Sequence, residues 1–402
     1  MVTHSPMNSS SVLPFKTVAL VHDYLVEYGG AERVLEALHE LFPDAPVYVS
    51  FVDRDRLGSA WEKFADWDIR ETWIARLPFY KQLYSPYRIF APRAFADLDL
   101  SAFDLVISSS NAYFAKAVRV PNGKHVCYCH TPPRALYGYT TGSNWKANPL
   151  TRWAGMLINH YLRIVDFEVS RERVDQFIAN SQETARRIEK FYRRDSTVIF
   201  PPVEVGGLDT GIASERAAKS DSMKLCAAQR ERKKTVATSD EKYFLYVNRL
   251  ALAKHPELAV EAATASRLPL KVVGTGPMLS RLRAIAGPTV EFVGFVPDEE
   301  LHELYQGAQA LLYPVEDEDF GIVPVEAMGH GVPVIAHNSG GPRETVIAGK
   351  TGVLFDELSA HGLTEAIREF QTITFDPASI HAHARSFRTE RFHEQLLHQL
   401  TS

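Results

Sequence analysis

The chain has 402 residues, enough for two domains of about 150–200 residues each. Hydrophobic residues make up 45% of it and charged residues 23%, which is typical of a globular protein and excludes a disordered or fibrous one. The formal net charge of −5 argues against a nucleic-acid partner, because proteins that bind nucleic acids concentrate positive charge against the phosphates.

The three cysteines, Cys127, Cys129 and Cys226, cannot form a complete set of disulfides, and the first two are spaced too closely for the usual zinc pair. A reducing, cytoplasmic environment fits them best. No segment has the run of about 18–20 apolar residues that spans a bilayer. The start, from Met1 to Pro14, lacks the layout of a signal peptide, and we expect a loose tail in its first residues.

The first half reads as alternating strands and helices. A short apolar run at 18–21 predicts a buried parallel strand, and Gly29 and Gly30 follow it, before a helical pattern over 31–41. The two glycines permit a close approach of backbone to a ligand, although an ordinary tight turn would also use them. Further strand-like runs lie at 47–51, 105–108, 125–129 and 176–179.

His130 directly follows the strand-like run 125–129 and precedes Thr131-Pro132-Pro133. Ligands of open α/β sheets bind at the carboxyl ends of the strands. A contact of His130 with ligand is therefore favoured over a purely structural role.

Residues 72–96 contain no acidic side chain. The cations Arg76, Lys81, Arg88 and Arg93 alternate there with the aromatic residues Phe79, Tyr80, Tyr84, Tyr87 and Phe90. A basic, aromatic surface of this kind suits an anionic membrane or a polyprenyl-diphosphate acceptor. The alternative is a partly buried helix whose aromatic residues pack inside the domain.

A polar stretch at 205–242 lacks apolar periodicity and predicts a linker or a surface insertion. After it the alternation restarts, which predicts a second α/β unit. Its expected strands are 243–247, 270–273, 289–293, 310–313 and 332–336, with helices over 256–265 and 299–307.

The densest motif lies in this second half. Glu318 and Glu326 flank Phe320-Gly321 and the expected start of a helix near Ile322. A helix N-terminus exposes unpaired N–H groups that suit a diphosphate, and carboxylates grip sugar hydroxyls. Solvated loop charges are the alternative, but Glu326 lies within an apolar run, where an unpaired charge is costly.

Two cations and a glycine pair follow the neighbouring strands. Arg249 and Lys254 come after the strand 243–247, where they could neutralise a diphosphate leaving group. Gly274 and Gly276 follow the strand 270–273, and by themselves they are weak indicators of phosphate contact.

Taken together, the motifs resemble the family 4 glycosyltransferases of the GT-B fold over residues 17–400. The stretch 318–326 is similar to their E-x7-E motif, Arg249 and Lys254 to their diphosphate-binding pair, and 29–30 to their glycine loop. The sequences YCHTPPR and SSSNAYFAK are similar to a bacterial branch that includes mannosyltransferases of O-antigen and exopolysaccharide assembly.

The resemblance implies an α/β protein with two Rossmann-like domains that face a central cleft. The acceptor-binding domain would be 1–203, joined by a terminal helix at 385–402, and the nucleotide-sugar domain would be 204–384. The polar stretch 205–242 is longer than the usual connection in the family.

The resemblance also implies residue roles. Glu326 would hold the ribose, Glu318 would contact the donor sugar, and His130 would lie beside the transferring end of that sugar. The nucleobase would lie near the loop that contains Val296. The implied catalytic residues are His130, Arg249, Lys254 and Glu318, and the implied donor-binding residues are Gly29, Gly30, Gly274, Val296, Phe320, Gly321, Ile322, Val323 and Glu326.

The implied activity is retaining transfer of a hexose, with GDP-mannose as the first choice of donor and a glycan or a polyprenyl-diphosphate-linked compound as acceptor. The implied location is cytoplasmic, with possible attachment to the inner face of the membrane.

No metal is expected. Asp317-Glu318-Asp319 is a D-x-D triplet of the kind that holds Mg²⁺ or Mn²⁺, but it lies inside the E-x7-E motif, and Arg249 and Lys254 already supply positive charge.

Three alternatives stay open from the sequence. A nucleotide-sugar epimerase of the same fold would act on its donor without an acceptor, and a non-catalytic binding protein would bind the nucleotide sugar alone. A Rossmann dehydrogenase is the weakest alternative, because Gly29-Gly30-Ala31-Glu32 is not the G-x-G-x-x-G pattern that it requires.

Overall fold

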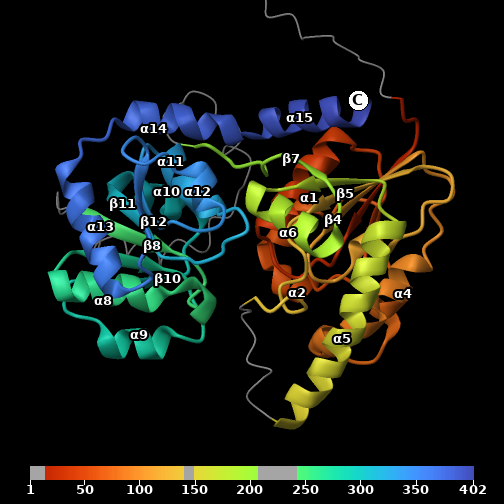
Figure 1. Cartoon of the computed structure of the whole chain (residues 1–402), viewed down its shortest axis with the longest axis horizontal. Coiled ribbons are helices and arrows are strands. Elements are labelled where there is room, and N and C mark those ends of the chain that lie inside the picture. The colour runs from red at the N-terminus through yellow and green to blue at the C-terminus, as the bar shows by residue number, and fades with distance from the viewer. Residues whose placement is uncertain (1–13, 140–148, 207–241) are drawn as a thin grey trace, which may run out of the picture. The chain divides into compact units, whose positions relative to one another are not determined.

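The computed structural model describes residues 14–139, 149–206 and 242–402 (Figure 1). The N-terminal tail, most of the polar stretch 205–242 and Cys226 lie outside the described residues. The chain divides into two compact units, one made of 1–202 with 389–402 and the other of 203–388. Each unit is described here by itself.

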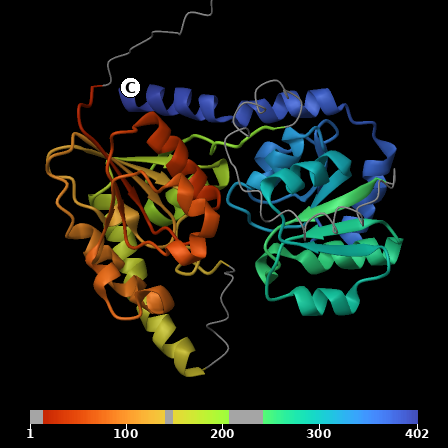
Figure 2. The same cartoon turned by 180° about the vertical axis from the view of Figure 1, so that it is seen from behind.

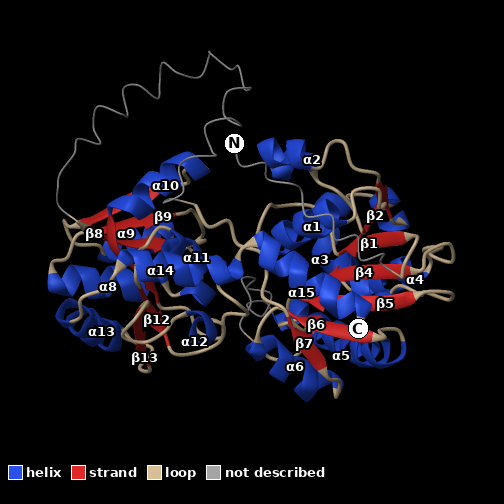
Figure 3. Cartoon of the chain, turned by 90° about the horizontal axis from the view of Figure 1, so that it is seen from above, coloured by secondary structure: helices blue, strands red, loops and turns tan. Residues whose placement is uncertain are grey.

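Unit 1 is built on a parallel sheet. Its seven described strands lie in the order β3-β2-β1-β4-β5-β6-β7, most of which can be followed in Figure 3. The central strands β1 and β4 are almost wholly buried, as expected of apolar runs covered on both faces. The strands are β1 Val18–His22, β2 Val47–Val49, β3 Ile69–Glu71, β4 Leu105–Ser110, β5 Lys124–Cys129, β6 Gln176–Ala179 and β7 Ser196–Val198.

Helices complete unit 1, and one of them comes from the end of the chain. Helix α15 (Thr389–Thr401) buries Phe392, Leu396 and Leu400 in the same core cluster as the sheet and lies beside α1, as Figures 1 and 2 show. The imidazole of His393 also hydrogen-bonds the Ala37 carbonyl of α1, with 2.7 Å between Nε2 and O. The other helices are α1 Gly30–Leu41, α2 Arg54–Leu57, α3 Tyr80–Tyr87, α4 Ala91–Ala96, α5 Pro149–Glu172 and α6 Gln182–Tyr192.

Unit 2 repeats the plan with a parallel sheet in the order β10-β9-β8-β11-β12-β13. The strands are β8 Tyr243–Val247, β9 Leu270–Val273, β10 Val290–Gly294, β11 Ala308–Tyr313, β12 Val334–His337 and β13 Gly352–Phe355. The helices are α8 Pro256–Ser266, α9 Leu279–Ile285, α10 Asp298–Gly307, α11 Ile322–Gly329, α12 Pro342–Thr345, α13 Ala360–Thr372 and α14 Pro377–Ala384.

The two sheets confirm the predicted α/β class with two Rossmann-like domains. In each sheet the strand order reverses once, between β1 and β4 in unit 1 and between β8 and β11 in unit 2. Ligands of such sheets bind beyond the carboxyl ends of the strands at this reversal. The loops that follow these strands are therefore the first places to examine for a site.

Several elements differ from the sequence-based expectations. The strand expected at 332–336 is β12 at 334–337, and the pattern did not predict β13 or the long helix α5. No helix among the described residues is both long and apolar enough to cross a bilayer.

The segment 72–96 folds as short helices, and most of its cations are engaged with other groups. Lys81 forms ion pairs with Asp53 and Asp55, at 3.2 Å and 2.8 Å. Arg88 is mostly buried and donates to the Asn159 side chain of α5, while Arg93 pairs with Asp97. Three of the four cations of the predicted basic, aromatic surface thus have partners within unit 1.

The aromatic residues of this segment divide between the core and the surface. Tyr80 and Tyr84 pack against the core of unit 1. Phe79 and Phe90 are exposed. The segment is thus partly the packed helix that the sequence left as the alternative.

Candidate active site

The loops after β8 and β11 meet at the point where the strand order of unit 2 reverses. Lys254 ends a short 3₁₀ turn after β8, and Glu318 lies in the loop after β11. Their side chains form an ion pair, with Nζ and Oε2 2.5 Å apart, and both are largely but not fully buried. The site thus presents a cation and a carboxylate side by side.

Glycines allow neighbouring loops to approach this ion pair. A Cβ at Gly274, whose φ is +125°, would lie 2.0 Å from the Asn248 carbonyl oxygen in the loop that carries Arg249. A Cβ at Gly340 would lie 2.2 Å from the carbonyl oxygen of Glu318. Only glycine fits at either position, because the φ values are positive and the neighbouring atoms are backbone. Gly274, predicted to bind the donor, therefore has a packing role in this structure.

Helix α11 begins at Ile322, shortly after Glu318. Gly321 precedes it with a φ of +85°, and no side chain caps the helix, so its first N–H groups have no side-chain partner from the cap. The helix is almost entirely apolar, and Glu326 is its one charged residue. The Glu326 carboxylate accepts a long hydrogen bond of 3.4 Å from the Tyr305 hydroxyl.

A buried tyrosine lies beside Glu318. Burial raises the pKa of Tyr313 well above its usual value, and the nearby charge of Glu318 and a hydrogen bond to it raise it further. The Tyr313 hydroxyl therefore stays protonated and can act only as a neutral hydrogen-bonding group beside the carboxylate.

In unit 1, His130 belongs to a chain of buried polar groups. Its Nε2 is 2.8 Å from the Ser109 hydroxyl, which is 3.0 Å from Nδ1 of His22. Nε2 of His22 faces the Glu32 carboxylate at 3.5 Å, and that carboxylate accepts from the Gly29 N–H. Burial is the main cause that lowers the pKa of His130 to about 3, and the neighbouring imidazole of His22 lowers it further.

The chain of contacts defines how the protons are arranged. A carboxylate opposite Nε2 of His22 favours a proton on that nitrogen, which leaves Nδ1 to accept from the Ser109 hydroxyl. The Ser109 oxygen can then accept from the Nε2–H of His130. Neutral His130 would therefore carry its proton on Nε2 and leave Nδ1 as the acceptor.

Asp23, directly after β1, organises the loop that follows β4. Its two carboxylate oxygens accept hydrogen bonds of 2.8–2.9 Å from the backbone N–H groups of Asn111, Tyr113 and Ala115. Three charge-assisted hydrogen bonds thus fix the loop after β4 to the end of β1. Sequence reasoning missed Asp23, His22 and Ser109, although an acidic residue directly after the first strand was a usable signal.

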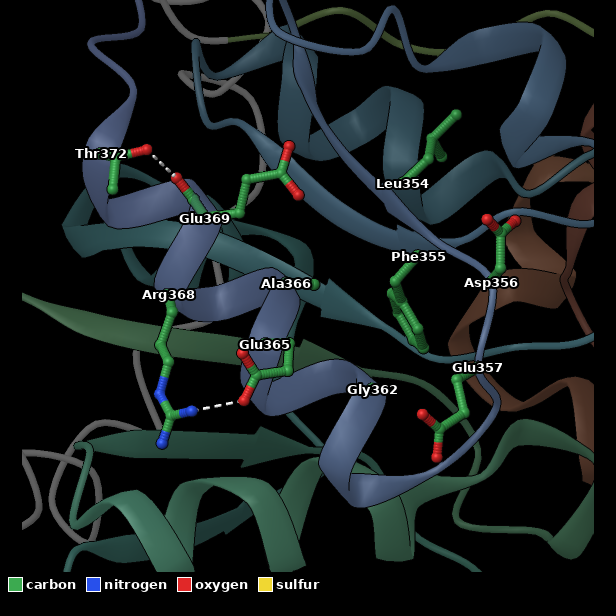
Figure 4. Close-up of a pocket in the computed structure, with 10 residues that line it drawn as sticks. All are labelled: Leu354, Phe355, Asp356, Glu357, Gly362, Glu365, Ala366, Arg368, Glu369 and Thr372. Carbon is green, nitrogen blue, oxygen red and sulfur yellow. Dashed lines mark hydrogen bonds and ion pairs between the residues drawn. The ribbon is translucent and has the colours of Figure 1, made fainter.

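The hollow between β13 and α13, of about 570 Å³, contains none of the predicted site residues (Figure 4). Four carboxylates line it, and its one cation, Arg368, pairs with Glu365. Such an acidic hollow is unsuited to a diphosphate. Among the described residues no group of three or more His, Cys, Asp or Glu side chains is arranged to hold a metal ion.

The predicted site residues are thus partly brought together. Lys254 and Glu318 are in contact, and Phe320, Gly321, Ile322, Val323 and Glu326 follow without a break into α11. Arg249 is exposed, whereas Val296 is buried after β10 beside the exposed Phe295. His130, Gly29 and Gly30 lie in unit 1, where Gly29 caps α1 with an extended φ of −135°.

Both halves of the chain match known protein families. Residues 28–206 match the model described as Glycosyltransferase Family 4, and residues 227–385 match the model described as Glycosyl transferases group 1. The chain belongs to the family 4 glycosyltransferases. It is a transferase of the GT-B fold, as the sequence predicted.

Named relatives of this glycosyltransferase include mannosyltransferases. It is 38% identical over 111 residues to a GDP-mannose-dependent alpha-mannosyltransferase of Mycolicibacterium smegmatis, which is 28% of this chain and 29% of that one. It is 24% identical over 396 residues to the alpha-1,3/1,6-mannosyltransferase ALG2 of Kluyveromyces lactis, which is 83% of this chain and 71% of that one. A 41% match to alg-2 of Neurospora crassa spans 24% of this chain and only 21% of the relative's length.

Solved structures show the same fold. The Anabaena HepE protein, in complex with UDP and glucose, superposes with a TM-score of 0.65 at 17% identity, over 96% of this chain and 99% of that one. WaaG, a glycosyltransferase of lipopolysaccharide biosynthesis, superposes with a TM-score of 0.57 at 16% identity, over 96% of this chain and 100% of that one.

Proposed function

We propose that this glycosyltransferase transfers mannose from GDP-mannose, with retention of configuration, to a lipid-linked or oligosaccharide acceptor in the synthesis of a cell-surface polysaccharide. The reaction would take place in the cytoplasm, at the inner face of the membrane. Family membership supports the reaction class. The relatives that are named mannosyltransferases support the sugar.

The contact between Lys254 and Glu318 carries the proposal. A nucleotide sugar places an anionic diphosphate next to a hexose with neutral hydroxyls. The ammonium of Lys254 suits the phosphate oxygens, and the carboxylate beside it suits the hydroxyls. Both groups lie at the strand reversal of unit 2, where nucleotides bind in sheets of this kind.

The remaining residues would complete the donor site. The backbone at 320–323, which includes the first N–H groups of α11, would approach the sugar and phosphates, and Glu326 would hold the ribose. Arg249 would share the diphosphate charge, which would stabilise the diphosphate as a leaving group. His130, neutral because of its lowered pKa, would offer a hydrogen bond at the transferring end of the sugar.

Donor identity is tested by thermal stabilisation. A ligand at 100 times its Kd adds about 2.7 kcal/mol to the unfolding free energy, which is a clear shift of melting temperature. GDP-mannose should raise the melting temperature more than UDP-glucose, GDP-glucose or UDP-galactose at the same concentration. Since the Anabaena relative binds UDP, a larger shift with UDP-glucose would reject GDP-mannose as the donor.

Turnover should require an acceptor and no metal. Because Lys254 and Arg249 can offset the diphosphate charge, transfer to acceptor should continue in EDTA. Loss of turnover in EDTA that Mn²⁺ restores would assign the Asp317–Asp319 triplet to a metal. Conversion of the donor sugar to an epimer without any acceptor would instead support an epimerase.

A further inference from the structure

Helix α5 of unit 1 is apolar on two opposite faces. Its inner face is buried, with Leu162 and Val169 in the core. Its outer face, which we call the α5 outer face, carries five large side chains that are 47–67% exposed: Trp153, Met156, Leu157, Tyr161 and Ile164. Trp153, Leu157, Tyr161 and Ile164 recur every three or four positions, with Met156 next to Leu157, and therefore form one stripe along the helix.

The helix is held firmly in place from its inner side. Asp166 is fully buried and pairs with Lys116 at 2.7 Å. Asn159 accepts from Arg88, and Arg163 donates to the Leu136 carbonyl, each at 2.8 Å. The exposure of the outer face is therefore not the consequence of a loosely placed helix. Figure 1 shows the N-terminal part of α5 reaching beyond the rest of unit 1.

Exposed apolar residues are concentrated in this part of unit 1. The bond between Arg88 and Asn159 ties the segment 79–90 to α5, and that segment exposes Phe79, Leu83 and Phe90. Helices that are apolar all round are normally covered, and large exposed apolar patches mark interaction sites.

Charge indicates what covers the α5 outer face. The sequence has no acidic residue from Leu105 to Val165 or from Thr72 to Ala96, although the net charge of the chain is −5. Exposed cations at Arg76 and Arg163 lie in these two segments. The stripe has Arg163 beside it and exposed acidic residues, Glu168 and Glu172, only beyond its C-terminal end. An apolar stripe with Trp and Tyr whose nearest exposed charge is a cation matches the interface of an anionic membrane, where aromatic rings lie at headgroup level.

We infer that the α5 outer face, together with the exposed residues of 79–90, docks this enzyme on an anionic lipid bilayer. The apolar side chains enter the headgroup boundary, and the cations approach the lipid phosphates. The inference deepens the proposed function and rests on it for the lipid-linked acceptor. It extends the basic, aromatic surface that the sequence predicted at 72–96 to α5, whose apolar side chains make the larger contribution because Lys81 and Arg93 are paired with carboxylates.

The test is co-sedimentation of the full chain with vesicles of mixed phosphatidylglycerol and phosphatidylcholine, and with vesicles of phosphatidylcholine alone. The parent should bind the mixed vesicles, and added salt should weaken the binding. The double variant Trp153→Gln/Leu157→Gln should bind them at least about tenfold less, since it removes the two most exposed side chains of the stripe. Ile347→Gln, at an exposed apolar position of unit 2, is the matched control and should bind as the parent does.

Two further measurements keep the outcome decisive. The melting temperature of each variant, with and without GDP-mannose, reports folding and donor binding, so failure of the donor proposal can be told apart from failure of docking. Sedimentation velocity reports the oligomeric state. Unchanged vesicle binding by the double variant overturns the inference. The inference is also overturned if the parent is a dimer that does not bind vesicles and the double variant is a monomer, since the face would then bind a second copy of the chain.

Discussion

At the scale of single residues, Glu318 and Glu326 should have separable effects on catalysis. Glu326→Ala removes a ribose contact made in both ground and transition states, so it should chiefly raise the donor KM. Glu318→Ala removes a charged hydrogen bond to the reacting sugar, so it should chiefly lower kcat, by roughly 10- to 150-fold for a loss of about 1.5–3 kcal/mol. Steady-state kinetics with varied donor distinguish the two. Parental kcat and KM in both variants would place the site elsewhere.

Ser109 should act as a positioning residue, because its hydroxyl bridges the rings of His22 and His130. Ser109→Ala should lower kcat about tenfold, since His130 loses the partner that fixes its proton, and Ser109→Thr should restore most of the rate. Ser108→Ala is the matched control: Ser108 precedes Ser109 in β4, and its change removes an equally buried 2.8 Å contact with His125.

Ser108→Ala should lose about 1–3 kcal/mol of stability, because it leaves one buried ring nitrogen without its partner, and Ser109→Ala should lose more, because it leaves two. Only Ser109→Ala should lose activity beyond what its lower stability explains. An equal loss of kcat in the two variants would show that Ser109 has only a structural role.

At the scale of elements, Gly274 allows the loop after β9 to pack closely against the loop after β8. An Ala there would bring its Cβ within 2.0 Å of the Asn248 oxygen at a positive φ, so Gly274→Ala should cost more than about 2 kcal/mol and weaken GDP-mannose binding. Gly349→Ala is the control, because its φ is also positive, at +73°, but nothing lies within 4 Å of the added Cβ. It should cost only about 1 kcal/mol, from φ alone. Thermal unfolding with and without donor compares them, and an equal cost would show that the loops can move apart.

Sequence could predict the elements and residues whose signal is local. Glu318 and Lys254 follow recognisable strands, and parallel topology brings the ends of neighbouring strands together. His22 and Ser109 gave no such signal, because they meet only through the register that pairs β1 with β4. The α5 outer face was missed for another reason: a helix that is apolar on both sides has no clear hydrophobic period.

At the scale of the whole molecule, acid should destabilise the fold through two buried histidines of unit 1. Burial lowers the pKa of His125 to about 4 and that of His130 to about 3, from a usual value of 6.5. Between these values the unfolded chain binds protons that the folded chain does not, so stability is fully present above pH 6.5 and falls as the pH falls. Each group contributes a slope of up to about 1.4 kcal/mol per pH unit.

Urea unfolding of the parent between pH 7 and pH 5 should therefore show a loss of about 4 kcal/mol in the unit 1 transition from the two histidines together. His125→Gln keeps a polar side chain but cannot take up a proton in this range, so its stability should be lower at pH 7 and fall about half as steeply toward pH 5. Because His125 lies on the opposite face of the sheet from the His22–Ser109 contact, this variant should also leave donor binding unchanged. A stability that stays level from pH 7 to pH 5 in the parent would mean that water reaches both rings and that unit 1 is less tightly closed around them than their burial indicates.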